Sequence, residues 1–157
     1  MSLRRVTGIA AATLAAAGLA VAGAGTASAE TEVPMTRCLG LSPYIVDQPY
    51  APARLFLTQS LPNEGPGKGT LRLHDVASLW FFAGGYQSDV RLDWRNVDNG
   101  KTGTLTDTAT VGTPGGDSAK FFLDAGPGKY DLTMSAYNKH ALWGMPTTSC
   151  TGSVTLN

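Results

Sequence analysis

The chain of 157 residues is electrically neutral, with 12 Lys and Arg against 12 Asp and Glu, and it contains two cysteines. This length fits one domain rather than two. A charged fraction of only 15% excludes a protein that binds nucleic acid through a clustered basic surface. The 3 Trp, 5 Tyr and 5 Phe exclude a wholly disordered chain.

Residues 1–29 have the features of a secretory signal peptide. Arginines at positions 4 and 5 precede an Ala-rich apolar run up to Val21, and Ala-Ser-Ala at 27–29 is a typical cleavage site. We therefore expect cleavage after Ala29 and a secreted protein, extracellular or bound to the cell wall. A membrane-spanning helix is the alternative, but glycines interrupt the apolar run and no basic flank follows it. The arginine pair also suggests twin-arginine export, although the apolar pair that normally follows is missing.

Removal of the signal leaves 157 − 29 = 128 residues with 10 basic and 12 acidic side chains, a net charge of 10 − 12 = −2. All 9 prolines and 15 of the 19 glycines remain. This density of breakers favours many short strands joined by tight turns. We expect a short N-terminal tail at 30–36 and a single all-β domain at 37–157, with one weak helical turn near Lys139–Trp143.

The strand pattern is clearest in the second half. Val90–Arg95 alternates apolar and charged residues, which is typical of a strand with one solvated face. Asn99-Gly100 indicates a hairpin with a type I′ turn, so Thr102–Thr106 should return antiparallel. Lys129–Ala136 alternates in the same way. Further strands are expected at Tyr44–Val46, Arg54–Thr58, Thr70–His74, Ser78–Phe82, Lys120–Asp124 and Gly152–Leu156.

An inward Trp94 on one alternating strand, followed by Tyr130 near the start of a later one, resembles an immunoglobulin-like or fibronectin-type β-sandwich. The resemblance implies an antiparallel sandwich of about 7–9 short strands, with Trp94 as the core Trp of strand C and Tyr130 in a tyrosine corner. The segments Leu92–Thr104 and Gly126–Ala136 are also similar to small exported proteins of actinomycetes, a group mostly without assigned activity. The cysteines depart from the antibody pattern, because they do not lie on strands B and F beside the Trp.

Cys38 and Cys150 are the only cysteines. In an exported protein they permit one intramolecular disulfide, which would tie the first strand to the last. The chain-entropy treatment gives such a long loop about 4–5 kcal/mol of stabilisation. An intermolecular bridge or two free thiols are the alternatives. Two cysteines and two scattered histidines match no zinc spacing, so no metal or cofactor is expected.

Catalytic signals are weak. His74 and Asp75 are adjacent on an expected strand and point to opposite faces, so they cannot form a dyad. His140 has no carboxylate close in sequence, and the three aspartates between positions 89 and 98 fit no EF-hand loop. No catalytic or phosphate-binding motif occurs. We therefore expect no enzymatic activity.

Two aromatic clusters are the best candidates for function. Leu79-Trp80-Phe81-Phe82 is either a central strand covered on both faces or an exposed apolar platform beside Gly84-Gly85-Tyr86. His140–Pro146 lies in a long connection before the last strand, where a sandwich can bind partners. There Trp143 either contacts a partner or anchors the loop under the sheet. The candidate partner-binding residues are Trp80, Phe82, Tyr86, Trp143 and Met145.

Three classes of function remain. The first, which we favour, is a monomeric, non-enzymatic interaction module outside the cell, with an unknown protein or cell-wall component as partner. It would bind no nucleic acid and have no membrane span after signal removal. The second is a secreted inhibitor of extracellular proteases that uses the loop Gly144–Ser149, preorganised by Cys150. The third is an enzyme of unrecognised type.

Overall fold

The computed structural model describes residues 30–36, 42–44, 54–59, 65–74, 78–112, 118–141, 144–146 and 149–157. Within these ranges, nine strands form two antiparallel sheets, and a single short 3-10 turn is the only helical element. The predicted signal peptide, residues 1–29, lies outside them. No helix in the described ranges is long and apolar enough to cross a membrane.

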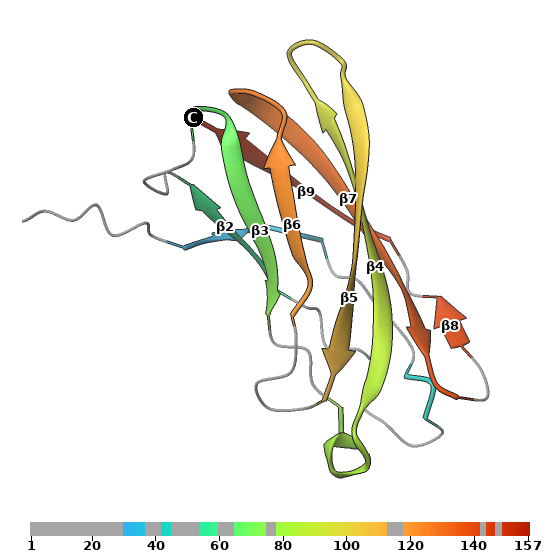
Figure 1. The fold of residues 1–157 in the computed structure, drawn as a ribbon. Helices are drawn as coiled ribbons and strands as arrows, with labels where there is room; N and C mark the ends of the chain where they lie inside the picture. Colours follow the sequence, from blue (N-terminus) through green and yellow to red (C-terminus); the bar gives the residue numbers. More distant parts are fainter. Residues whose placement is uncertain are drawn as a thin grey trace, which may run out of the picture.

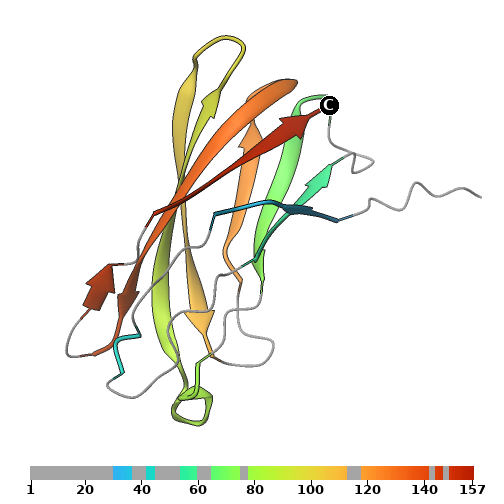
Figure 2. The same cartoon turned by 180° about the vertical axis from the view of Figure 1, so that it is seen from behind.

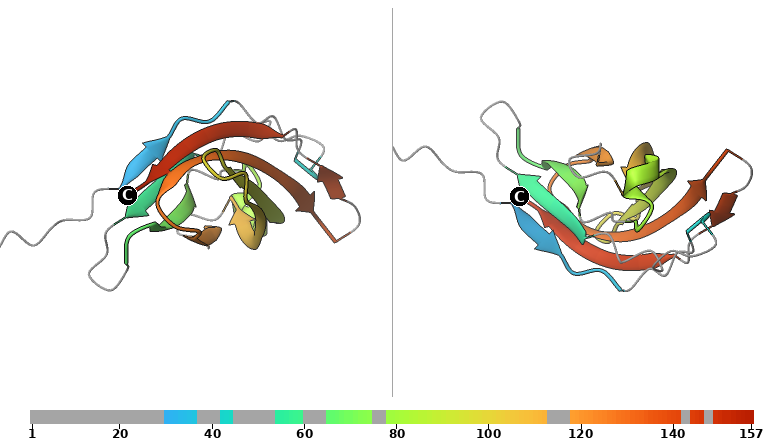
Figure 3. Two further views of the ribbon diagram at one scale, coloured as in Figure 1. Left: turned by 90° about the horizontal axis from the view of Figure 1, so that it is seen from above. Right: turned by 90° about the horizontal axis from the view of Figure 1, so that it is seen from below.

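The first sheet has four strands in the order β1 (Thr31–Val33), β2 (Arg54–Gln59), β3 (Lys68–His74) and β6 (Lys120–Asp124). The second sheet begins with β5 (Thr102–Val111), β4 (Tyr86–Asn96) and β7 (Gly128–Lys139). On its far edge, β7 pairs with β8 (Gly144–Pro146) and with β9 (Cys150–Leu156). Figures 1 and 2 show the two sheets from opposite sides, and Figure 3 shows the strong twist of their strands.

The chain passes from one sheet to the other between β3 and β4, between β5 and β6, and between β6 and β7. As a result, β3 and β6 are neighbours in one sheet, and β4, β7 and β9 are neighbours in the other. Immunoglobulin-like sandwiches have the same arrangement, with strands B and E in one sheet and C, F and G in the other. The prediction of an all-β sandwich is confirmed.

Alternation along the strands decides which side chains fill the space between the sheets. In β4, Val90 and Leu92 are buried, and their neighbours Arg91 and Asp93 face the solvent side. The two inner faces together form one apolar core, whose removal from water is the main favourable term in folding. Its largest fully buried members are Tyr130, Phe121, Leu55, Leu71, Leu73, Leu92, Leu123, Leu132 and Leu156.

The hairpin predicted after Val90–Arg95 is present, but its turn differs from the predicted type I′ turn. The ladder ends at Arg95 and Thr102, and the backbone N–H of Asn96 donates to the carbonyl of Lys101 at 2.8 Å. The side-chain Oδ1 of Asn96 accepts from the amides of Asp98 at 2.8 Å and Asn99 at 3.1 Å. This side chain therefore organises a longer loop than a two-residue turn.

Three other segments differ from the sequence-based expectations. Ser78–Phe82 is not a strand: it is a turn that leads into the 3-10 turn η1 (Phe81–Ala83). Lys139, where a helical turn was expected to begin, is the last residue of β7. Within the expected N-terminal tail, Thr31–Val33 forms β1 against β2. Of the strand expected at Tyr44–Val46, the described residue Tyr44 lies in a bend, and the remainder lies outside the described ranges.

Candidate functional site

A short apolar projection between β3 and β4 is the candidate site, and we call Leu79, Trp80, Phe81 and Phe82 the aromatic tip. Its turn is closed by local hydrogen bonds. The amide of Trp80 donates to Ser78 Oγ at 3.1 Å, and the Trp80 carbonyl accepts from the amides of Ala83 at 2.9 Å and Gly85 at 3.1 Å. A single 3-10 turn has no second layer to cover its side chains, so large residues placed in it project outwards.

The base of the tip needs glycine, because two backbone segments meet there. Gly85 has φ 67°, and a Cβ at this position would lie 1.9 Å from the carbonyl oxygen of Val111. Gly112 has φ 105°, and its Cβ would lie 2.8 Å from Cβ of Ser78. Both conformations are rarely adopted by other residues. The backbone of the tip is therefore held closely against the end of β5.

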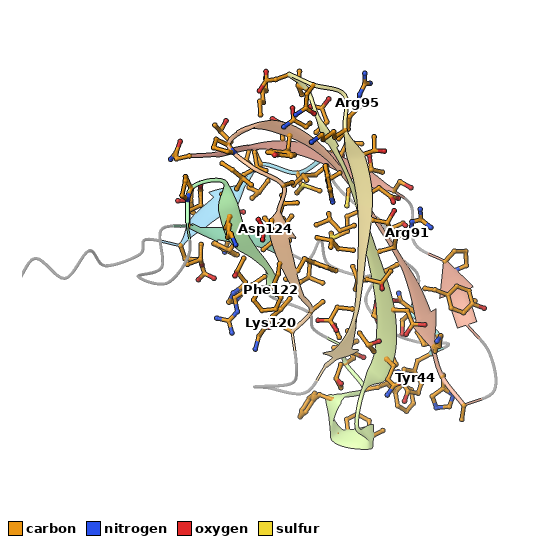
Figure 4. The ribbon with its side chains drawn as sticks, turned by 45° about the horizontal axis from the view of Figure 1, so that its top comes forward. Tyr44, Arg91, Arg95, Lys120, Phe122 and Asp124 are labelled. Atoms are coloured by element: carbon orange, nitrogen blue, oxygen red, sulfur yellow. The ribbon has the colours of Figure 1, made fainter. Side chains whose placement is uncertain are left out.

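Tyr44 joins the tip to two other segments of the chain (Figure 4). Its ring stacks on Trp80, with centroids 4.9 Å apart and planes 15° apart, and its hydroxyl donates to the Gly85 carbonyl at 2.9 Å. The same ring lies 4.8 Å from the ring of His140, which follows β7. Tyr44 and His140, which are remote in sequence, thus pack beside the tip, and Trp80 lies between the rings of Tyr44 and Phe82.

The surface of the tip that faces away from the sheets is exposed and apolar. The exposed fractions are 53% for Leu79, 54% for Phe81 and 73% for Phe82, and the two Phe rings meet edge-on at 5.9 Å. Trp80 is half-buried beneath them. Residues 78–85 contain no charged side chain. Scattered apolar side chains on a surface are ordinary, whereas these three large ones are grouped in one turn.

The structure brings Trp80 and Phe82 together in the tip, as the platform interpretation of this segment predicted. Tyr86 is only 4% exposed and stands edge-on to Tyr44, so it belongs to the base of the tip rather than to its surface. Met145 is exposed on β8, and Trp143 lies outside the described residues. Leu79 and Phe81 belonged to the predicted cluster but not to the candidate partner-binding residues, and sequence reasoning missed Tyr44 entirely.

The loop expected to act as a protease-binding segment is partly a strand. Gly144–Pro146 forms β8 and pairs with Tyr137–Lys139 of β7. Gly144 lies so close to the ring of Tyr137 that a Cβ would be 2.4 Å from it. The first half of this segment is therefore fixed against the edge of the sheet, with Met145 and Pro146 exposed.

Several charged groups near His74 and on the sheet faces form simple pairs. His74 Nε2 lies 3.2 Å from Glu30 Oε1. On the outer face of the second sheet, Arg91 donates to Asp93 at 2.8 Å, and this hydrogen bond lowers the pKa of Asp93 and raises that of Arg91. Among the described residues there is no group of three or more His, Cys, Asp or Glu side chains that could hold a metal ion.

No known family model matches the chain, and comparisons with curated proteins and with solved structures find no similar protein. The class of the molecule therefore follows from its own topology, an immunoglobulin-like sandwich with an apolar tip at one end.

Proposed function

We propose that the protein is exported and acts outside the cell as a non-enzymatic binding module, with the aromatic tip as its contact surface. The exposure of three adjacent large apolar side chains on a rigid base carries this proposal. Aromatic residues dominate the energetics of protein interfaces, and a preorganised loop loses little conformational entropy when it binds. The partner would be a protein or cell-wall component with an apolar recess that accepts Phe81 and Phe82.

Because residues 78–85 carry no charged side chain, binding through the tip should be insensitive to salt. Burial of apolar surface would drive the binding, and this term is not screened by salt. Binding through the tip should therefore persist at high ionic strength, whereas a contact between charged groups would weaken.

The test is capture of partners from culture supernatant and isolated cell wall of the producing organism. The exported protein is compared with the double variant Phe81→Ser, Phe82→Ser at low salt and at about 0.5 M NaCl, where the Debye length is only a few ångströms. We expect the variant to lose the partner and wild type to keep it in both buffers. Val97→Ser is the control, because Val97 is also exposed but lies at the other end of β4. Equal capture by both variants would contradict the proposal.

A protease assay separates the alternative function. Stoichiometric inhibition of a broad-range serine protease, or cleavage at one bond between Gly144 and Ser149, would favour an inhibitor. Inhibition abolished by the Phe81→Ser, Phe82→Ser variant would instead assign the protease as the partner of the tip.

Export and a Cys38–Cys150 disulfide are parts of the same proposal. The pattern of residues 1–29 supports export, and N-terminal sequencing of secreted protein should find Glu30 first. Thr36, two residues before Cys38, donates its amide to the Thr151 carbonyl at 2.8 Å, and Met35 forms a bridge with Gly152. Cys150 is fully buried at the start of β9. These contacts bring the chain next to Cys150 shortly before Cys38, and Cys38 itself lies outside the described residues.

Intact-mass measurement with thiol alkylation tests the disulfide. Alkylation of unreduced protein should add no mass, and alkylation after reduction should add two groups. Two groups added without reduction would show free thiols, and a covalent dimer under non-reducing conditions would show an intermolecular bridge.

A further inference from the structure

The outer face of the first sheet carries more cations than anions. Its outward-facing cationic side chains are Arg54 on β2, Lys68 and Arg72 on β3, and Lys120 on β6, and His74 of β3 faces the same way. The acids beside them on this sheet are Glu30, Glu32 and Asp124, and each forms an ion pair: Arg54 with Glu32, Lys68 with Asp124 at 2.9 Å, and His74 with Glu30 at 3.2 Å. A fourth acid, Asp107 of β5, accepts a hydrogen bond from the backbone amide of Lys120 at 2.7 Å.

The side-chain head groups of Arg72 and Lys120 form no ion pair with the described acids, and the two residues lie directly opposite each other in the β3–β6 register. Side chains that are opposite in an antiparallel pair have Cβ atoms about 5 Å apart, and like charges there repel. Moreover, Arg72 Nε is buried and has no hydrogen-bond partner in the described part of the chain. Both features are unfavourable in the free protein, and an anion bound between the two head groups would relieve the repulsion.

An exposed aromatic ring stands beside this cation pair. Phe122 is 68% exposed, follows Lys120 by two residues and therefore projects from the same face of β6 (Figure 4). In the register it lies opposite Thr70, one diagonal step from Arg72. On the other side, Phe56 of β2 lies opposite Arg72. A planar guanidinium and an ammonium can bind an anionic group together, and the ring of Phe122 can pack against the C–H face of a sugar.

We propose that this face, formed by Arg72, Lys120 and Phe122, binds an anionic polysaccharide. A phosphate or carboxylate group would bridge the two cations, and the adjoining sugar unit would lie on Phe122. Phe122 lies one diagonal step from Arg72, about 7–8 Å, so the site extends beyond a single inorganic anion bound by the two cations. The site is separate from the aromatic tip and does not depend on the function proposed for it.

Binding to immobilised polymers tests the proposal with full exported protein. The probes are a phosphorylated mannan, polygalacturonate and an unmodified neutral mannan. We expect binding to at least one anionic polymer, with none to neutral mannan, and the preferred polymer identifies the group that bridges the cations. Arg72→Gln and Lys120→Gln should each weaken binding about tenfold or more, as expected for loss of a charge-assisted hydrogen bond. Absence of binding to both anionic polymers would overturn the proposal.

Matched controls distinguish this site from general attraction to a basic surface. Arg95→Gln and Lys101→Gln remove the same charges from exposed positions in the β4–β5 hairpin, and they should leave binding unchanged. Phe122→Ser should weaken binding, whereas Phe82→Ser should not, so failure here is distinguishable from failure of the tip. Equal losses in all four charge variants, or tighter binding to anionic lipid vesicles than to the polymers, would overturn the assignment.

Lys120→Glu separates a lost site from a damaged fold. A glutamate opposite Arg72 replaces repulsion by an ion pair, so the melting temperature should rise by about one to three degrees while polymer binding disappears. Retained binding in this variant would show that Lys120 does not contact the polymer. A lowered melting temperature would show that the two cations are not in unfavourable contact.

Discussion

Aromatic residues gather at both ends of β4, but they pack into the core at one end and are exposed to solvent at the other. Near Asn96, the hydroxyl of the fully buried Tyr130 donates to the Gly126 carbonyl at 2.7 Å, and its ring meets Trp94 edge-on at 5.7 Å. Near Tyr86, at the other end, Phe81 and Phe82 project into solvent. The first end closes the core, and the second exposes its aromatic side chains. Apolar composition alone therefore does not distinguish packing from a contact surface.

The hydrogen bond of Tyr130 has a direct counterpart in immunoglobulin-like domains. A tyrosine corner places a Tyr near the start of strand F, with its hydroxyl bonded to the backbone a few residues upstream. Here the acceptor is four residues upstream, and the strand is β7. The role predicted for Tyr130 is confirmed. Trp94 packs against the core as predicted, but it is only half-buried at the end of the sandwich.

The largest expected effect contrasts one ring from each end. Tyr130→Ala removes a fully buried ring and should lower the free energy of unfolding by about 3–5 kcal/mol. Phe82→Ala removes an exposed ring and should change it by less than about 0.5 kcal/mol. Urea denaturation of both variants measures the difference. A loss above about 2 kcal/mol for Phe82→Ala would mean that the tip belongs to the core, and the comparison would fail.

A double-mutant cycle at the closed end gives the next largest effect. Trp94 lies over Gly103, its partner in the β4–β5 register, where a Cβ would be 2.5 Å from the indole ring. Trp94→Ala should cost about 2–3 kcal/mol, less than for a fully buried Trp. Gly103→Ala should cost about 1–3 kcal/mol because the ring must move.

In the double variant, the alanine at position 103 no longer meets the indole, so the two losses should not add. Additive losses in urea denaturation would show that Trp94 does not depend on the space above Gly103.

The hydroxyl of Tyr130 should contribute a smaller, separable amount. Tyr130→Phe keeps the ring but leaves the Gly126 carbonyl without this donor, at a cost of about 1–2 kcal/mol. Tyr137→Phe is the control, because Tyr137 is an exposed tyrosine on the same strand, β7. Thermal unfolding of both variants should show a lower melting temperature only for Tyr130→Phe. Equal melting temperatures for the two variants would show that the hydroxyl of Tyr130 does not stabilise this end of the sandwich.

The sequence predicted most strands because period-two alternation reports one solvated and one buried face. Lys120–Asp124 has the predicted bounds, and the strand predicted at Arg54–Thr58 is one residue longer. Leu79–Phe82 was ambiguous because four consecutive apolar residues have no period. Two local signals favoured a turn: Ser78, whose hydroxyl accepts from the amide two residues on, and the pair Gly84-Gly85, which adopts positive φ.

The sequence could not predict which residues distant in the chain lie side by side in the fold. Arg72 and Lys120 are far apart in the chain, and only the register of β3 against β6 places them opposite each other. A shift of one residue would turn either side chain into the core, so the site exists only in this register. The stacking of Tyr44 on Trp80 likewise depends on how the segment before β2 passes the tip. No local pattern contains this information.

The smallest expected effect comes from the solvated face between the two ends, where Arg91 and Thr104 bind the carboxylate of Asp93. The pKa of Asp93 is lowered mainly by the hydrogen bond from Arg91. A lowered pKa in the folded state means that stabilisation is present above the unfolded value of about 3.9 and is lost as pH falls through the folded value.

Because the side chain of Asp93 is 39% exposed, Asp93→Asn should cost at most about 0.5 kcal/mol at neutral pH. Urea denaturation of wild type and variant from about pH 7 to pH 2 should show this difference shrinking towards zero in acid. If the difference in unfolding free energy grew in acid, the pKa of Asp93 would be shifted in the opposite direction. A difference near 3 kcal/mol would mean that the Arg91–Asp93 pair is buried, whereas on a solvated face it should contribute far less than the buried rings.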